Sequence, residues 1–263
     1  MTGTRPTGGS GDPITILGLQ FGRFPEADSL HPRFLPDHER MRLTLEISPG
    51  IPLPSPSAML ADMERIFPGL RRHRCGGDRP LGAWSADDTA GPDDPRTGIA
   101  HLIEHLIIDI QHFVADMRRC SGVTCAFRSP AHRFDIFIES PGRDISRLGV
   151  ALACATTSSL VLGRPPDPVF PSAARLARAV TRHPLQPITS IVARDWLDQE
   201  RRSPDDPDID GALHVLHAQG FVEKFDACVD FSGVPLYHAV SGGPAEPPRH
   251  AMPGPLNLDL SSP

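Results

Sequence analysis

The sequence contains a single lysine, Lys224, so nearly all of its positive charge comes from arginine. A P-loop of the GK[ST] type is absent, and no G-x-G-x-x-G stretch follows a predicted strand. These absences exclude phosphate chemistry of the P-loop kind and leave no fingerprint for a dinucleotide cofactor.

Long apolar runs are also absent. No segment approaches the roughly 18 consecutive apolar residues of a membrane span, and the N-terminus lacks the apolar core of a signal peptide. The 5 cysteines are odd in number and irregularly spaced, so they form no disulfide framework and suit a reducing compartment. We therefore expect a cytoplasmic protein with no membrane partner. The net charge of -6 argues against broad attraction to nucleic acid.

Hydrophobic periodicity predicts an α+β protein with two units. Residues 14–162 are expected to form a mixed or antiparallel sheet packed with helices, one of which carries an H-x-x-E-H motif. A Pro-rich linker, 163–171, leads to residues 172–240, whose three helices and hairpin have the layout of a winged helix. Residues 1–13 and 241–263 are too poor in apolar residues to fold and are expected to be disordered tails.

The predicted elements follow from apolar spacing and breakers. The expected strands cover 14–24, 42–48, 123–128 and 133–139, and the expected helices cover 57–67, 99–117, 144–162, 172–181, 188–200 and 209–219. A loop is expected over 76–98 and a C-terminal hairpin over 221–240.

The most informative stretch is His101-Leu102-Ile103-Glu104-His105, which has the H-x-x-E-H pattern of the inverted zincins. On a helix this spacing places both imidazoles on one face, one turn apart, where they can bind one ion. Glu104 lies beside them and can act as a general base toward the attacking water. We therefore predict one Zn²⁺ on His101 and His105, with Glu104 catalytic. A structural interpretation stays open, because backbone groups can also satisfy a buried histidine or carboxyl.

A catalytic zinc usually has three protein ligands, so a third must come from elsewhere in the chain. Glu139, at the end of the predicted strand 133–139, is the expected third ligand. Asp109, one turn after His105, is either an alternative ligand or the hydrogen-bond acceptor of a ligating histidine. His112, on the same helix face, is interpreted as structural support.

Two further pairs of residues are candidates for binding a substrate or a metal. Arg128 and Arg133 flank the turn of a predicted hairpin and could bind a substrate carboxylate in bidentate fashion, although a solvated surface is the competing interpretation. His73 and Cys75 are a possible ligand pair, but no second pair matches them, so both are interpreted as structural.

The sequence resembles the N-terminal domain of cyanophycin synthetases over about Ile14 to Leu162. The blocks that carry the resemblance are Pro-Gly-Leu followed by His73-Arg74-Cys75, then Thr97, the block His101 to Gln111, and the strand Phe134 to Glu139. The resemblance implies a metal-dependent hydrolase domain, similar in its H-x-x-E-H helix to pitrilysin-type peptidases, that cuts the Asp-Arg polymer internally.

The resemblance also implies roles for individual residues. His101 and His105 match metal ligands, Glu104 matches the general base, and Glu139 matches a recurrent strand glutamate. The chain departs from the family at Asp109, where glutamate is common. Glycine is usual at position 100, which is alanine here, and neither an ATP-grasp nor a Mur-ligase-like domain follows the resembling region. We therefore expect a free-standing hydrolase rather than a synthetase.

Three functional hypotheses result. The first is a zinc-dependent hydrolase that cleaves peptide or isopeptide bonds in cyanophycin or a related peptide or polypeptide. The second is a non-catalytic regulatory or adaptor protein with a structural metal, in which residues 172–240 dock a protein partner. DNA is disfavoured there because the predicted recognition helix, 209–219, contains no Arg or Lys. The third is an inactive hydrolase whose ligands serve stability alone.

Overall fold

The computed structural model describes residues 12–31, 33–34, 36, 38–75, 79–81, 94–199, 208–229 and 235–240. The predicted tails lie outside the described residues except for 12–13, as do most of the loop expected over 76–98 and the tip of the C-terminal hairpin. Among the described residues the fold class is α+β, as predicted, with seven helices and a four-stranded antiparallel sheet.

The main sheet has the strand order β1-β2-β6-β5, with all neighbours antiparallel. Its strands are β1 (Ile14–Gly22), β2 (Arg40–Ile47), β5 (Gly122–Ala126) and β6 (Arg133–Glu139). Alternation along β2 explains why the sheet has two different faces. Met41, Leu43 and Leu45 are fully buried and point into the main core, whereas the residues between them point to the opposite face.

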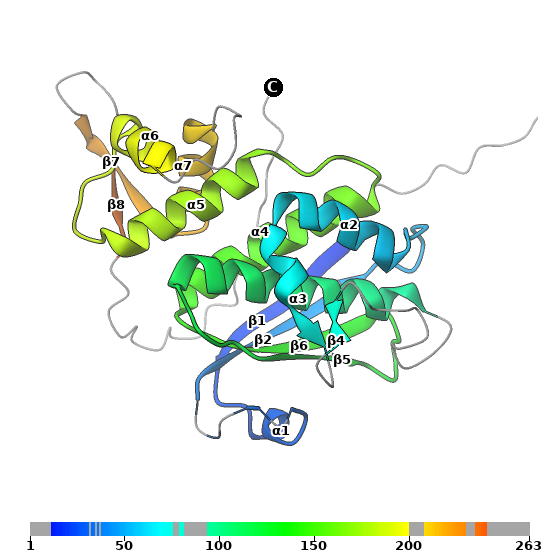
Figure 1. Cartoon of the computed structure of the whole chain (residues 1–263). Coiled ribbons are helices and arrows are strands. Elements are labelled where there is room, and N and C mark those ends of the chain that lie inside the picture. Colours follow the sequence, from blue (N-terminus) through cyan, green and yellow to red (C-terminus); the bar gives the residue numbers. More distant parts are fainter. Residues whose placement is uncertain are drawn as a thin grey trace, which may run out of the picture.

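The helices cover the sheet unequally. They are α1 (Pro25–Asp28), α2 (Pro56–Ile66), α3 (Pro95–Ala115), α4 (Arg143–Val161), α5 (Val169–Arg182), α6 (Ser190–Gln199) and α7 (Ile209–Ala218), with a 3₁₀ helix η1 (Pro68–Arg72) after α2. In Figure 1, α3 and α4 lie over one face and α1 lies beneath the other. Within the described residues no helix has both the length and the apolarity of a membrane span.

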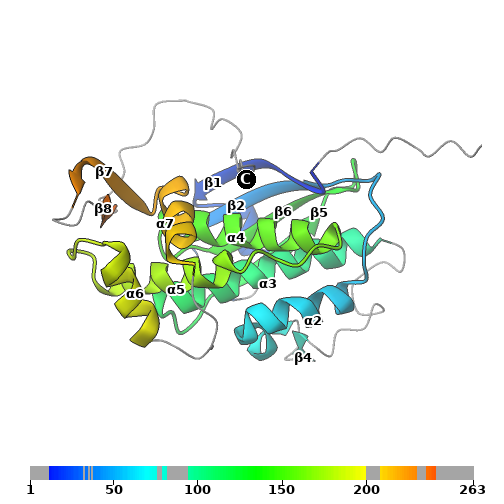
Figure 2. The same cartoon turned by 90° about the horizontal axis from the view of Figure 1, so that it is seen from above.

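Helix α3 is the structural centre of the helical layer. It begins four residues earlier than the sequence predicts because Pro95 occupies its first turn and the Asp94 carboxylate caps it, accepting from the Arg96 amide at 3.0 Å. The helix ends where Asp116 adopts a left-handed conformation, with φ of 55°. Figure 2 shows α3 between α4 and α2. Its side chains are buried on most sides, which matches its nearly continuous apolar sequence.

The opposite face of the sheet is covered by the short helix α1, which the sequence analysis did not predict. Ala27, Phe34 and Phe137 form a small second apolar cluster there. Arg40, only 1% exposed, pairs with Asp28 at 2.8 Å and lies under the Phe34 ring. An arginine buried in this way needs its carboxylate partner, so the pair fixes α1 to the sheet.

The C-terminal unit contains α5, α6 and α7 followed by the strands β7 (Val222–Val229) and β8 (Pro235–Ala239), in the predicted order. Its buried side chains belong to the same apolar cluster as those of the sheet and α3. Two further short strands, β3 (Arg74–Cys75) and β4 (Arg79–Pro80), pair after η1. For Cys75, Arg79, Pro80 and residues 225–229 the description is limited to the backbone.

The polar network between β2 and β6 gives a first prediction. Asp135 accepts from Arg42 Nε at 3.1 Å and Nη2 at 2.5 Å and from Thr44 Oγ1 at 2.7 Å, and its side chain is 10% exposed. Asp135→Ala leaves these donors without an acceptor, and we expect the free energy of unfolding to fall by about 2 kcal/mol.

Chemical denaturation measures this change, and Glu46→Ala is the matched control. Glu46 joins the same two strands through Arg133, but both side chains are more exposed, at 27% and 43%. A loss below about 1 kcal/mol is expected there. Equal losses for the two variants would contradict the role given to Asp135.

Candidate metal centre

Three potential ligands come together on one face of α3. One ligand atom from each of His101, Glu104 and His105 lies within 4.8 Å of the others, and the two Nε2 atoms are 2.9 Å apart. This is the geometry that the one-turn spacing of the H-x-x-E-H motif produces. Among the described residues no other group of three histidine, cysteine or acidic side chains meets in this way.

Both histidines are held in the form that binds metals. Burial lowers the pKa of His101 to about 4, and burial together with the neighbouring His101 and His73 lowers the pKa of His105 well below its ordinary value. A neutral imidazole has one nitrogen with a free lone pair, which is what a metal ion requires. The apolar surroundings of α3 therefore keep the pair uncharged near pH 7.

Glu104 is fixed between α3 and the edge strand β5. Its side chain accepts from Thr124 Oγ1 at 2.5 Å, and only 3% of the residue is exposed. Burial raises the pKa of Glu104 to about 7, although the Thr124 hydrogen bond acts in the opposite direction. A Cβ at Gly122 would lie 2.9 Å from Glu104 Oε1, so the absence of a side chain there lets the carboxyl group approach the strand.

A hydrogen-bond chain continues from the other side of His105. His105 Nδ1 lies 3.2 Å from His73 Nδ1, and His73 Nε2 lies 3.1 Å from Asp109 Oδ1. His73 follows η1 and was interpreted as structural from the sequence. The sequence feature that could have indicated this contact is the Pro-Gly-Leu segment just before His73. Its glycine, Gly69, leaves room for the Asp109 carboxylate, which a Cβ at that position would overlap.

With a neutral His73, the hydrogen-bond series from His105 through His73 to Asp109 defines which nitrogens carry protons. A carboxylate only accepts, so we infer that His73 donates from Nε2 to Asp109 and accepts at Nδ1. His105 must then donate from Nδ1, and its Nε2 retains a lone pair that faces His101. The arrangement thus presents His105 in the tautomer that a metal ion at Nε2 needs.

Glu139, the expected third ligand, lies elsewhere. Its Oε2 accepts from the Ser121 amide at 2.8 Å. In the sheet register Glu139 is directly opposite Arg40, and opposed residues share a face. Arg40 points to the α1 side, so strand alternation directs Glu139 away from α3. It is not a member of the group of three formed by the described residues.

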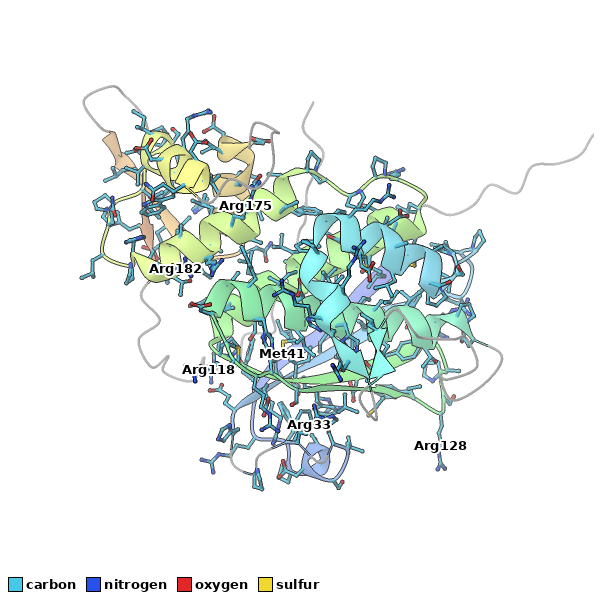
Figure 3. All side chains as sticks on the ribbon, in the orientation of Figure 1. Arg33, Met41, Arg118, Arg128, Arg175 and Arg182 are labelled. Carbon is cyan, nitrogen blue, oxygen red and sulfur yellow. The ribbon has the colours of Figure 1, made fainter. Side chains whose placement is uncertain are left out.

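The remaining predicted site residues lie at various distances from the group. Asp109 contacts His73, which is outside the group of three and is not a predicted ligand, instead of joining the group. The His112 ring is 6.2 Å from the His73 ring. Arg133 pairs with Glu46 at 2.8 Å. Arg128 projects from the far end of the β5–β6 hairpin (Figure 3). The Cys75 side chain lies outside the described part of the structure.

A large groove opens beside the group. Its volume is about 1880 Å³, and it runs along the C-terminal half of α3 between η1 on one side and α5 on the other. Glu104, His105 and Asp109 line it, whereas neither Arg128 nor Arg133 does. We call this space the α3 groove. It gives a ligand access to two of the three grouped side chains.

The donor set fits a divalent ion of the zinc type. Two neutral imidazole nitrogens and one carboxyl group converge, which is a common nitrogen and oxygen ligand set for zinc. Two nitrogen ligands of one tetrahedral zinc lie about 3.3 Å apart, so the two Nε2 atoms, now 2.9 Å apart, would have to separate slightly to receive the ion. If Glu104 acts as a base instead of a ligand, His101 and His105 supply two of the three protein ligands that are usual for a catalytic zinc.

The chain matched no protein-family model, no curated protein and no solved structure. The roles of its residues therefore rest on the geometry described above.

The hydrogen-bond chain through His73 predicts the effect of a glycine substitution. Gly69→Ala places a methyl group against Asp109 and separates that carboxylate from His73, and His73→Ala removes the chain altogether. Both variants should weaken zinc binding by about 10- to 100-fold, because the partner of a ligating histidine fixes its orientation.

Competition with a chromophoric chelator measures the zinc affinity. Gly50→Ala is the control, since a Cβ at Gly50 meets nothing within 4 Å. If zinc affinity is unchanged in both Gly69→Ala and His73→Ala but lost in His101→Ala, the hydrogen bonds through His73 do not support His105 as a ligand.

The buried Glu104 carboxyl predicts a pH dependence of stability in metal-free protein. Its pKa rises from 4.5 to about 7 on folding, so its contribution is fully present below pH 4.5 and is lost as the pH rises through 7. This loss amounts to about 3 kcal/mol at 1.36 kcal/mol per pKa unit. As the pH rises from 4.5 to 8, the free energy of unfolding of Glu104→Gln should therefore increase by about 3 kcal/mol relative to that of wild type.

Urea denaturation in the presence of EDTA at several pH values gives the comparison. The two histidines titrate in both proteins, so their effect cancels in the difference. A difference between the two proteins that stays constant with pH would mean that Glu104 is not the titrating group.

Proposed function

We propose that the protein is a zinc-dependent hydrolase of peptide or isopeptide bonds. The observation that carries this proposal is the position of Glu104. It is a buried carboxyl group with a pKa near neutrality, beside a neutral histidine pair, and it lines a groove large enough for a peptide. Groups with strongly shifted pKa values in a cleft are typical of catalytic sites.

The residues of the chain would divide the chemistry as follows. Zinc, when bound to His101 and His105, supplies a Lewis acid that polarises the scissile carbonyl and acidifies water. Glu104 accepts the proton of the attacking water and passes it to the leaving amine. Its pKa of about 7 suits both steps, because the group exchanges a proton readily near neutral pH. Thr124 holds one carboxyl oxygen, so the other is available for the transfer.

The substrate in this proposal is a peptide or polypeptide. Cyanophycin or a related Asp-Arg material is the specific candidate that the family resemblance implies. That candidate is independent of the site geometry, so the assay should include cyanophycin, β-linked Asp-Arg oligomers and ordinary peptides.

Elemental analysis combined with activity assays tests the proposal. We expect about one zinc per chain in wild type, loss of zinc in His101→Ala, and retained zinc with activity reduced at least 100-fold in Glu104→Gln. His112→Ala is the control, because His112 lies on the same helix but outside the group of three, and it should retain zinc. Full activity in Glu104→Gln, or wild-type protein without metal, would refute the proposal.

A second candidate function is supported by the burial of the same group. Glu104 and His105 are only 3% and 5% exposed, which also suits a structural metal. In this case the unit formed by α5, α6, α7 and the β7–β8 hairpin would be a winged-helix-like module that docks a protein partner. Zinc in the stoichiometry given above, with no hydrolysis of any peptide and with partner binding that is insensitive to salt, would favour this function.

A further inference from the structure

The charge of the α3 groove differs from that of the whole protein. The chain carries a net charge of -6, yet nine arginines and six acidic residues are among the groove residues that the structure describes. The arginines come from segments that are distant in sequence. Arg72 belongs to η1, Arg118 follows α3, Arg164 precedes α5, and Arg175 lies on α5, where Figure 3 labels it.

The acidic residues of the groove are already engaged. Asp62 pairs with Arg65, Asp109 with His73, and Asp116 with Arg178 and Arg182. The three others accept from nearby groups: Asp167 from the Val169 amide, Asp208 from the Gly211 amide and Glu104 from Thr124. Each carboxyl group therefore has a donor from the protein itself.

Several arginines of the groove have no carboxylate partner among the described residues. Arg72, Arg118, Arg119 and Arg164 are exposed and form no ion pair with any residue that the structure describes. A guanidinium group binds a carboxylate through two parallel hydrogen bonds and is weakly hydrated, so it loses little when it contacts one. The groove thus has a surplus of cations with geometry suited to carboxylates.

We propose that the α3 groove is the binding site for a carboxylate-rich peptide, which these exposed arginines hold in an extended conformation next to Glu104 and His105. This inference rests on the proposed function and narrows its substrate class. About 16 Å of helix separates His105 from Asp116 at 1.5 Å per residue. That length accommodates about five residues of an extended peptide.

The lining of the groove disfavours a nucleic acid. Single-stranded nucleic acid is bound through bases that stack on exposed aromatic rings. Two phenylalanines line the groove: Phe67 is 7% exposed, and the Phe113 ring is covered by the Arg178 guanidinium at 4.7 Å. The described lining therefore offers charge, but no freely exposed phenylalanine, tyrosine or tryptophan ring on which a base could stack.

The test uses the Glu104→Gln variant, for which no turnover is expected, with fluorescein-labelled octaglutamate as the probe. Fluorescence anisotropy should show binding of octaglutamate and none of octalysine. Arg118→Gln combined with Arg164→Gln should weaken the binding about tenfold, because two charge-assisted contacts are lost.

A matched pair, Arg147→Gln combined with Arg194→Gln, removes the same charge from exposed positions outside the groove and should change the affinity less than twofold. Equal losses in the two double variants would mean a general charge effect and would overturn the proposal. An octathymidylate that binds as tightly as octaglutamate would also overturn it.

The assay separates this inference from the proposed function, because it needs neither zinc nor turnover. If the protein binds octaglutamate but holds no zinc, the proposed hydrolase function is refuted and the proposed peptide site in the α3 groove is supported. Hydrolysis of uncharged peptides without any octaglutamate binding supports the hydrolase and overturns the inference about the groove.

Discussion

The burial of polar groups on an apolar helix is the constraint on which the rest of this structure depends. Helix α3 carries two imidazoles and a carboxyl group into a core of leucine and isoleucine, where an unpartnered polar group would cost several kcal/mol. Each partner comes from a different place: Thr124 from the edge strand, His73 from the segment after η1, and Asp109 from the next turn of α3. Satisfying the group therefore fixes the helix against both neighbours.

Two glycines make these approaches possible. Gly122 lets the Glu104 carboxyl group lie against β5, and Gly69 lets Asp109 lie against η1. A methyl group at Gly69 would overlap Asp109 Oδ1, and one at Gly122 would lie only 2.9 Å from Glu104 Oε1. Close packing around Glu104 and Asp109 thus depends on two residues without a side chain. The Pro-Gly-Leu segment and the start of β5 therefore matter to the site, although neither provides a ligand.

The sequence predicted the fold class, the order of the main elements and the three grouped residues, because those follow from local periodicity. The i, i+4 spacing in α3 needs no tertiary information. The predicted third ligand, Glu139, is not in the group. Strand β6 alternates: Phe134, Ile136 and Ile138 face α3, while Glu139 shares the other face with Arg133, Asp135 and Phe137. This alternation already indicates the face that Glu139 occupies, so its choice as a ligand rests on its place at the strand end and on the family resemblance, and not on strand periodicity.

The chain from His105 through His73 to Asp109 could not be predicted for a different reason. It joins residues that are 32 and 36 positions apart, and only the packing of η1 on α3 brings them together. The same holds for the α3 groove, whose arginines belong to segments before α3, after it and at α5. The net charge of the sequence is negative, so it does not indicate that arginines outnumber acidic residues in this groove.

The groove and the buried group are linked by dielectric effects. Glu104 and His105 lie at its wall, nearly inaccessible to water, so a peptide in the groove would exclude solvent from the side that remains open. Electrostatic interactions strengthen as water leaves, and the exposed arginines can form their carboxylate contacts at a distance from the reacting bond. Binding energy from remote carboxylates would then position the scissile bond, which is the general way in which enzymes use non-reacting parts of a substrate.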